Sequence, residues 1–385
     1  MAKRIVLGMS GGVDSSVSVV LLQRAGWEVV GVTCVFAAET PAEQATAEAA
    51  ARDAAEVARA LGVEHHVYDC RDVFVANVVE PFCAAYAAGL TPSPCVTCNR
   101  TTKLPSLLRA AEELGAEAIA TGHYARVVRL NGRPVLMRAL DDSKDQSYML
   151  AQVPTEILDK LVLPLGGMTK VDVRLLAEDL GLPVAHRADS QDICFAPKGY
   201  REVLRAHGVA GTPGEIVTTD GRVVGTHAGL EQYTAGQRSG LGIGGAPEPY
   251  YVLGKDAAAN RLTVGFAAEA VIGAVDVNHV VWQAFEGMPD KVEAMVKLRY
   301  RSFPAACVVE RLTGEADASG NVACTAATDA SGAVATGAAE YRVRLLSPQT
   351  VTAAGQAAVF YQGDTVLGSG IISGVLPVKY LADGE

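Results

Sequence analysis

The densest group of residues able to do chemistry lies at positions 8–16, which read Gly-Met-Ser-Gly-Gly-Val-Asp-Ser-Ser. Glycines let successive backbone N–H groups face a ligand, serine hydroxyls donate hydrogen bonds, and a helix start adds positive dipole. The segment therefore indicates an anion site suited to phosphates, with an ordinary capped glycine turn as the less favoured reading. It is neither a Walker A loop nor a Rossmann loop, because the Gly-Lys-Ser/Thr ending and the Gly-x-Gly-x-x-Gly spacing are absent.

Thiols form the second chemical group. Cys95 and Cys98 make a C-x-x-C in a proline-rich loop, and Cys194 follows Asp-Ser-Gln-Asp-Ile. Alone, a C-x-x-C indicates a redox pair or half of a zinc site. Both fit poorly because no second C-x-x-C follows, and His123 would have to complete a zinc site from a distance. We expect the other cysteines to be small buried hydrophobes: Cys34, Cys70, Cys83, Cys307 and Cys324.

The composition of the chain limits the class of protein to which these residues can belong. The chain has 385 residues, of which 49% are hydrophobic and 20% charged, so it is globular and long enough for two or three domains. No apolar run reaches the roughly 20 residues that span a bilayer, and eight cysteines are too sparse for a disulfide scaffold. We therefore expect a cytoplasmic protein without a membrane partner. A net charge of -10 argues against bulk attraction to nucleic acid but leaves room for a local basic patch.

Hydrophobic periodicity predicts three regions. Residues 1–204 alternate apolar strands with helical spacing, as in a parallel α/β sheet, and Thr169 with Asp172 forms a capping box at the start of one helix. Residues 205–272 are rich in glycine and proline and predict a small β-rich central domain. Residues 273–385 alternate in strand fashion, which is typical of an antiparallel β-barrel. Strand alternation would place Lys297, Arg299 and Arg301 on one face, with Tyr300 on the other.

Several motifs together resemble one family. They are GMSGGVDSS, TPSPCVTCNR, ATGHY, KDQSYML, DSQDICF, GQRSGLGI, LRYR, GQAAVFY and GSGII, and they run through nearly the whole chain. The first motif resembles that of the PP-loop ATP pyrophosphatases, and the full set is similar to the tRNA-specific 2-thiouridylases. The resemblance implies an N-terminal PP-loop domain and the two β-rich domains described above.

The family's activity is ATP-dependent thiolation of the wobble uridine, U34, of tRNA. By resemblance, Asp14 serves magnesium or the pyrophosphate end, Cys194 carries a persulfide, and Cys98 resolves it through a Cys98–Cys194 disulfide. Lys103, Arg100 and His123 would supply polar surroundings for these thiols. The ATP-binding positions implied are Gly8, Met9, Ser10, Gly11, Gly12, Val13, Asp14, Ser15, Cys34 and Gly122.

The resemblance also implies partners: tRNA, and a cysteine desulfurase or sulfur-carrier protein as sulfur donor. The implied tRNA contacts are Ser93, Pro94, Cys95, His123, Lys144, Asp145, Gln146, Arg299, Tyr300 and Gln356. Without the resemblance, residues 144–146 would be read as a surface turn.

The chain departs from the family pattern at Ser93, Leu104, Cys95 and Ser239. Ser93 replaces an Asn, Leu104 a Phe, Cys95 a carboxylate, and Ser239 a Lys or Arg. Because Cys95 stands where other members have a carboxylate, the general base is unassigned. With three cysteines available, Cys95, Cys98 and Cys194 would be the ligands of an iron-sulfur cluster with one open iron position, an alternative that we do not favour over the persulfide relay. Two other functions stay open: a PP-loop enzyme that adenylates a small molecule, and a non-catalytic tRNA-binding homologue.

Overall fold

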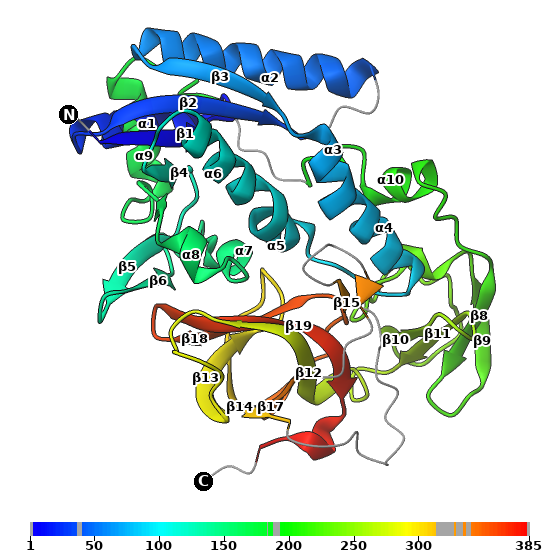
Figure 1. Cartoon of the computed structure of the whole chain (residues 1–385). Coiled ribbons are helices and arrows are strands. Elements are labelled where there is room, and N and C mark those ends of the chain that lie inside the picture. Colours follow the sequence, from blue (N-terminus) through cyan, green and yellow to red (C-terminus); the bar gives the residue numbers. More distant parts are fainter. Residues whose placement is uncertain are drawn as a thin grey trace. The chain divides into compact units, whose positions relative to one another are not determined.

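The computed structural model describes residues 3–36, 41–182, 184–187, 193–312, 327–328, 334–335 and 340–382. The chain divides into two compact units, which are treated separately below (Figure 1). The first unit contains residues 1–78, 95–197 and 363–367, and the second contains 79–94, 198–362 and 368–385. Within the described part of the chain, no helix is both long and apolar enough to cross a lipid bilayer.

A parallel sheet forms the centre of the first unit. Its strand order is β3-β2-β1-β4-β7, and every neighbouring pair is parallel. The bounds are β1 Arg4–Gly8, β2 Glu28–Val35, β3 Glu64–Asp69, β4 Ala118–Ala120 and β7 Leu161–Val162. Parallel strands align their carboxyl ends at one edge of the sheet, where ligands of such folds bind.

Helices cover both faces of this sheet because its strand residues are apolar on both sides. Ile5 and Leu7 of β1 belong to a buried cluster with side chains of α1, α2 and α9, whereas Gly8 lies against Leu107 of α6. The helices with residues in this unit are α1 Val13–Arg24, α2 Pro41–Ala60, α3 Arg71–Phe74, η1 Val75–Val79, α5 Pro94–Cys98, η2 Asn99–Lys103, α6 Leu104–Glu113, α7 Ser147–Leu150, α8 Thr155–Leu158 and α9 Lys170–Asp179. The predicted capping box is confirmed: Asp172 N donates to Thr169 Oγ1 at 3.1 Å, and Thr169 N donates to Asp172 Oδ2 at 3.2 Å.

A β-hairpin, β5 Arg126–Leu130 and β6 Arg133–Met137, follows β4. Its turn residues Asn131 and Gly132 have φ values of 52° and 82°, the left-handed conformation that a two-residue hairpin turn requires. Met137 pairs with Thr365, which belongs to the same unit.

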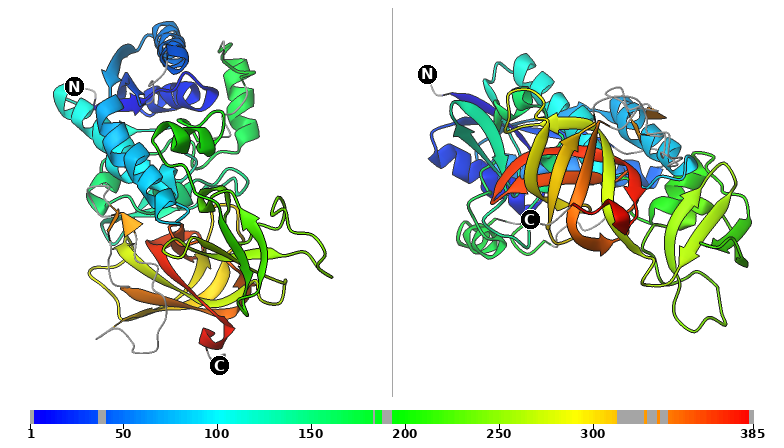
Figure 2. Two further views of the ribbon diagram at one scale, coloured as in Figure 1. Left: turned by 90° about the vertical axis from the view of Figure 1, so that its right-hand side faces the viewer. Right: turned by 90° about the horizontal axis from the view of Figure 1, so that it is seen from below.

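The second unit is mostly β-structure. One sheet has the order β10-β11-β8-β9, and six further strands close into an antiparallel barrel because β12 pairs with both β17 and β19 (Figure 2). The elements are α4 Glu80–Ala87, α10 Tyr200–Ala206, β8 Gly214–Thr218, β9 Val223–His227, η3 Leu230–Gln232, β10 Tyr251–Asp256, β11 Arg261–Gly265, β12 Val271–Trp282, β13 Lys291–Lys297, β14 Ala305–Arg311, β15 Ala327–Thr328, β16 Val334–Ala335, β17 Tyr341–Thr350, β18 Ala357–Gln362, β19 Thr365–Leu376 and η4 Val378–Tyr380. The predicted fold class, a parallel α/β sheet followed by β-rich and barrel structure, is confirmed. The boundaries at 204 and 272 stay predictions.

One local prediction is wrong. Strand β13 ends at Lys297, and the chain then turns, with Ser302 N donating to the carbonyl of Arg299 at 3.1 Å. Arg299 and Arg301 therefore do not share a strand face with Lys297, because the alternation that orders side chains applies only within an extended strand.

Candidate functional site

The glycine-serine loop joins β1 to α1 at the carboxyl edge of the parallel sheet. Met9 N donates to the carbonyl of Val32 at 2.8 Å, and Thr33 Oγ1 donates to the carbonyl of Met9 at 2.9 Å, so β2 fixes the start of the loop. Gly11 has a φ of 70°, and a Cβ there would lie 3.1 Å from the carbonyl oxygen of Ala50. Position 11 therefore requires glycine for both its backbone conformation and its packing.

Serine side chains close the loop onto the first helix turn. Ser15 Oγ donates to the carbonyl of Gly12 at 3.2 Å and accepts from Ser10 N at 3.3 Å, while Ser16 Oγ donates to the same carbonyl at 2.8 Å. Gly12 takes the N-cap position of α1 without a side-chain cap. The first N–H groups of a helix have no intrahelical partner, so this end of α1 can receive a phosphate.

Asp14 is held by two residues from distant parts of the chain. Lys170 Nζ donates to both carboxylate oxygens, at 2.7 and 2.8 Å, and the hydroxyl of Tyr124 donates to Oδ1 at 2.7 Å. The Lys170 ammonium also lies 5.7 Å from the centre of the Tyr124 ring. The Lys170 side chain is only 9% exposed, so the first residue of α9 brings a nearly buried ammonium to the carboxylate of Asp14, in the first turn of α1.

The segment after β4 connects the loop to the thiols. A Cβ on Gly122 would lie 3.2 Å from Asp14 Cβ and from Ser15 N, so Gly122 packs directly on the start of α1. The next residue, His123, shares a 2.7 Å hydrogen bond between Nδ1 and Thr121 Oγ1. Burial, aided by the nearby charge of Lys103, lowers the pKa of His123 to about 3, so its ring is neutral at physiological pH.

Cys34, near the end of β2, is half-buried and contacts a second thiol. The thiols of Cys34 and Cys70 share a hydrogen bond, which raises the pKa of Cys34 and lowers that of Cys70. The prediction of small buried cysteines is confirmed for Cys70, Cys83 and Cys307 and is wrong for Cys34, while Cys324 lies outside the described residues. Cys34 differs from Cys70 in that its side chain is only half-buried.

The three thiols singled out from the sequence lie in one neighbourhood. Cys98 is buried, whereas Cys95 and Cys194 are exposed, and all three are free cysteines. Burial raises the pKa of the Cys98 thiol to about 12, and Cys194 and Cys95 are near enough to raise it further. Cys95 and Cys194 reach solvent, but the protein atoms around their sulfurs still desolvate them, and this raises their pKa values.

Lys103 opposes this effect at each thiol. Its positive charge lowers the pKa values of Cys95, Cys98 and Cys194, and its backbone N–H donates to the Cys98 sulfur. A π-helical turn, η2, lies between Cys98 and α6 and ends at Lys103. Its wider turn places the backbone N–H of Lys103 against Cys98. The sulfur of Cys194 accepts from the backbone N–H groups of Cys194 and Phe195.

The other two residues expected near the thiols differ from Lys103. Arg100 donates to Gln152 Oε1 at 2.7 Å, whereas the charge that lowers the thiol pKa values is that of Lys103. His123 lies near enough to Lys103 for that charge to lower its pKa, and its ring is neutral.

The predicted RNA-contact turn at 144–146 belongs to the first unit and is tied to the loop. Asp145 is buried and accepts from Ala139 N at 3.0 Å and from Ser147 N at 3.1 Å. Gln146 Oε1 accepts from Tyr124 N at 2.8 Å, so this turn supports the tyrosine that contacts Asp14. Lys144 alone of the three is a cation in this turn, and its side chain is half-buried.

In the second unit, two predicted RNA contacts bind backbone carbonyls. Gln356 Nε2 donates to the carbonyl of Thr91 at 2.7 Å and to that of Pro92 at 3.3 Å. Arg299 Nη2 donates to the carbonyls of Ala235, at 2.9 Å, and Val351. Gln356 therefore holds the segment that precedes Ser93 and Pro94, and both of those residues are half-buried. Tyr300 is half-buried beneath the ammonium of Lys297, 5.8 Å from its ring centre.

Lys170, Tyr124 and Arg187 were missed by sequence reasoning. Arg187 Nη1 donates to the carbonyl of Gly11 at 2.9 Å. Lys170 directly follows the N-cap of a correctly predicted helix, but nothing local shows that the end of this helix meets a loop 156 residues away. In the part of the chain that the structure describes, no group of three or more His, Cys, Asp or Glu side chains is arranged to hold a metal ion.

The fold and the loop define an α/β nucleotide-binding enzyme of the PP-loop type. The family model for the tRNA methyl transferase HUP domain matches residues 3–198, that for the tRNA methyl transferase PRC-barrel domain matches 201–266, and that for the Aminomethyltransferase beta-barrel domain matches 318–372. A tRNA-specific 2-thiouridylase MnmA from Acidithiobacillus ferrooxidans is 40% identical over 97% of this chain and 99% of its own length. One from Xanthobacter autotrophicus is 45% identical over 80% of this chain and 82% of its own. The chain belongs to the MnmA family of tRNA-specific 2-thiouridylases, which makes it a tRNA sulfurtransferase.

A solved structure of another tRNA thiolase is more distant from this chain. The U34-tRNA thiolase NcsA from Methanococcus maripaludis, with its [4Fe-4S] cluster, covers 53% of this chain and 64% of its own, with 20% identity and a TM-score of 0.34. At that level the likeness says nothing about the thiols of this chain.

Proposed function

We propose that this protein carries out ATP-dependent 2-thiolation of the wobble uridine, U34, of tRNA. One observation carries the proposal: a phosphate-binding loop and two thiols share one neighbourhood through residues 121–123. Gly122 packs on Asp14 and Ser15, and the charge of Lys103 acts on both His123 and the thiols. Adenylation and sulfur transfer could therefore act on one uridine in turn.

ATP is assigned to residues 8–15, together with Cys34 and Gly122. The loop offers N–H groups at the start of α1, and the buried Lys170 offers a positive charge beside them. The Asp14 carboxylate is an oxygen ligand of the kind that magnesium prefers. Because Asp14 already accepts from Lys170 and Tyr124, a magnesium ion bound with the triphosphate would share this carboxylate with them.

Cys194 is assigned the persulfide, because it is exposed and accepts two backbone N–H groups. Uridine O2 first displaces pyrophosphate from ATP and becomes bonded to AMP. The terminal persulfide sulfur then attacks C2, a C–S bond forms, and the C–O bond to AMP breaks. The Cys98 thiolate attacks Cys194 Sγ, which breaks the S–S bond, releases 2-thiouridine and leaves a Cys98–Cys194 disulfide for reduction by a thiol reductant.

The pKa values of the thiols before sulfur is loaded are consistent with this order of steps. Their raised pKa values keep them protonated and unreactive, while Lys103 is the charge that can stabilise a thiolate. The persulfide relay needs only Cys98 and Cys194. An iron-sulfur cluster would need Cys95 as a third ligand beside these two. A cysteine desulfurase or sulfur carrier supplies the sulfur.

For tRNA, we assign the contacts to residues 93–95, His123, 144–146, Arg299, Tyr300 and Gln356. Their roles differ. Lys144 and Tyr300 have side chains suited to direct contact with phosphate and base. The other polar side chains of this set hold backbone groups and so shape the surfaces that the tRNA would meet. Asp145 and Gln146 accept from backbone N–H groups, whereas Arg299 and Gln356 donate to backbone carbonyls.

The test is mass spectrometry of the wobble nucleoside in tRNA from cells depleted of this protein. We expect 2-thiouridine to fall and to return when the wild-type gene is restored. Restoration by Asp14→Ala or Cys98→Ser protein would instead favour a non-catalytic tRNA-binding role. Unchanged 2-thiouridine on depletion would favour an enzyme that adenylates a small molecule.

A further inference from the structure

The motif at 236–243, Gly-Gln-Arg-Ser-Gly-Leu-Gly-Ile, has no part in the assignments above. It forms an irregular loop of the second unit between η3 and β10. Gly236, Gly240 and Gly242 have φ values of 84°, 75° and 67°, in the left-handed region that glycine adopts without strain. The loop therefore depends on its glycines for its backbone shape.

The backbone around Arg238 is fixed by hydrogen bonds. Gly236 N donates to the carbonyl of Val252 at 2.7 Å, and Val252 N donates to the carbonyl of Gln237 at 2.9 Å. The Gln237 side chain accepts from Thr234 N at 3.2 Å and donates to the carbonyl of Ser239 at 2.9 Å. These bonds constrain the residues on both sides of Arg238.

Arg299 supports the same loop, and this contact occupies most of the hydrogen-bond donors of its guanidinium. Its Nη2 donates to the carbonyls of Ala235 and Val351, its Nε donates to Thr352 Oγ1 at 3.4 Å, and a Cβ on Gly236 would lie 3.0 Å from Nη2. A guanidinium with these bonds has few donors left for a phosphate. The loop is nevertheless tied to the turn that carries Tyr300 and Arg301.

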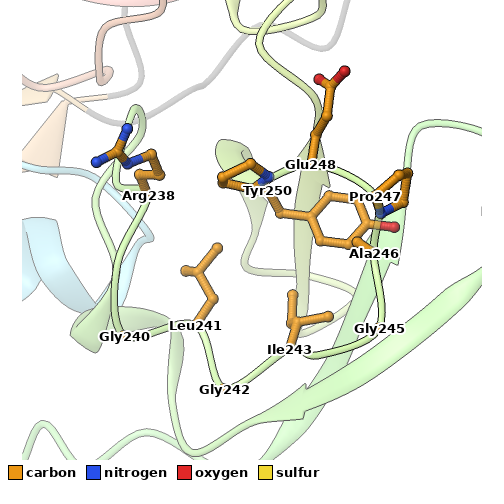
Figure 3. A pocket seen from close by; sticks show the side chains of 11 residues that line it. Arg238, Gly240, Leu241, Gly242, Ile243, Gly245, Ala246, Pro247, Glu248 and Tyr250 are labelled. Atoms are coloured by element: carbon orange, nitrogen blue, oxygen red, sulfur yellow. The ribbon is translucent and has the colours of Figure 1, made fainter.

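Arg238 itself is exposed, and among the described residues its guanidinium makes no hydrogen bond or ion pair. It stands beside a hollow of about 390 Å³ that Leu241, Ile243, Glu248 and Tyr250 also line. Figure 3 shows the Arg238 and Glu248 side chains pointing in different directions. A loop held by backbone hydrogen bonds thus presents, next to open space, a cation that has no partner in the described part of the chain.

We propose that Arg238 binds a backbone phosphate of the substrate tRNA, an inference that rests on the proposed function. A single guanidinium without converging donors is too weak a site for a small free anion, but it adds to the binding of a polyanion. The chain has a net charge of -10, so tRNA binding depends on local cations of this kind.

The test compares tRNA affinity of full-length wild-type and Arg238→Gln protein between about 0.05 and about 0.5 M salt. Loss of one phosphate contact should make the slope of log K against log salt less steep by about 0.7 to 0.9, which corresponds to about five- to eightfold weaker binding at 0.1 M. Affinity for ATP should not change. Arg205→Gln is the matched control, because Arg205 is an exposed arginine of the same unit on α10, and it should bind tRNA like the wild type.

Ser239→Lys provides an independent arm that adds a cation beside Arg238. We expect a steeper salt slope and tighter binding, and circular dichroism will show whether either loop variant has lost structure. A wild-type slope for Arg238→Gln, or an equal effect of Arg205→Gln, would overturn the inference while wild-type thiolation leaves the proposed function intact. If the wild-type protein itself neither binds nor thiolates tRNA, both fail.

Discussion

Replacing Lys170 by methionine removes the ammonium at the phosphate loop and keeps most of the side-chain volume. The ammonium donates to both oxygens of Asp14, at 2.7 and 2.8 Å, and the two side chains are 9% and 33% exposed. Breaking a fully buried pair costs about 3 to 5 kcal/mol. Here solvent reaches Asp14, and the Tyr124 hydroxyl remains, so we expect a loss of about 1 to 3 kcal/mol in the free energy of unfolding.

We expect Lys170→Met to impair catalysis as well as stability. A hydrogen bond to a charged group contributes about 1.5 to 3 kcal/mol, so loss of the lysine should lower kcat/KM for tRNA-dependent pyrophosphate release about ten- to hundredfold. The affinity for tRNA should stay at the wild-type level. Lys160→Met is the matched control, because Lys160 is an exposed lysine of the same unit, and its pyrophosphate release should be unchanged.

Urea unfolding measures the change in stability, and a pyrophosphate assay measures the change in kcat/KM. A double-mutant cycle with Asp14→Asn should give a coupling energy of about 1 to 3 kcal/mol in stability. Additive effects in the cycle would contradict the ion pair. Wild-type kcat/KM in folded Lys170→Met protein would contradict the role of the lysine at the phosphates.

Three further changes test the same neighbourhood. Gly122→Val should raise KM for ATP, measured by pyrophosphate release, because even a Cβ there lies 3.2 Å from Asp14 and Ser15; an unchanged KM would separate Gly122 from the site. Lys103→Met should raise the pKa values of Cys98 and Cys194 further, so the pH profile of sulfur transfer should move to higher pH; a profile that stays in place would remove Lys103 from thiolate stabilisation. Cys95→Ala should keep most of the thiolation in aerobic and anaerobic assays, whereas joint loss of bound iron and activity would establish a catalytic cluster.

Local patterns predicted the parts of this fold whose cause is local. The apolar run at 5–7 and the glycines after it gave β1, the loop and α1, and the Thr169–Asp172 capping box marked the start of α9. The hairpin β5–β6 also had a local signal, because Asn131-Gly132 between two strand-forming runs favours a two-residue turn.

The site was less predictable, because its key contacts join distant segments. Lys170 meets Asp14 only because α9 packs beside α1. Arg299 looked like an exposed strand cation, yet the turn after Lys297 directs it onto backbone carbonyls. Gln356 likewise supports the segment before Ser93 through the carbonyls of Thr91 and Pro92. Such roles depend on tertiary packing, which a single sequence does not display.

The central claim is that Cys194 delivers sulfur to a uridine activated at the phosphate loop. The most direct measurement supplies purified protein with ATP, tRNA and a persulfide donor, and determines both pyrophosphate release and 2-thiouridine by mass spectrometry. We predict that Cys194→Ser protein releases pyrophosphate in the presence of tRNA but forms no 2-thiouridine, while the wild type does both. Substantial 2-thiouridine from Cys194→Ser protein would contradict the account.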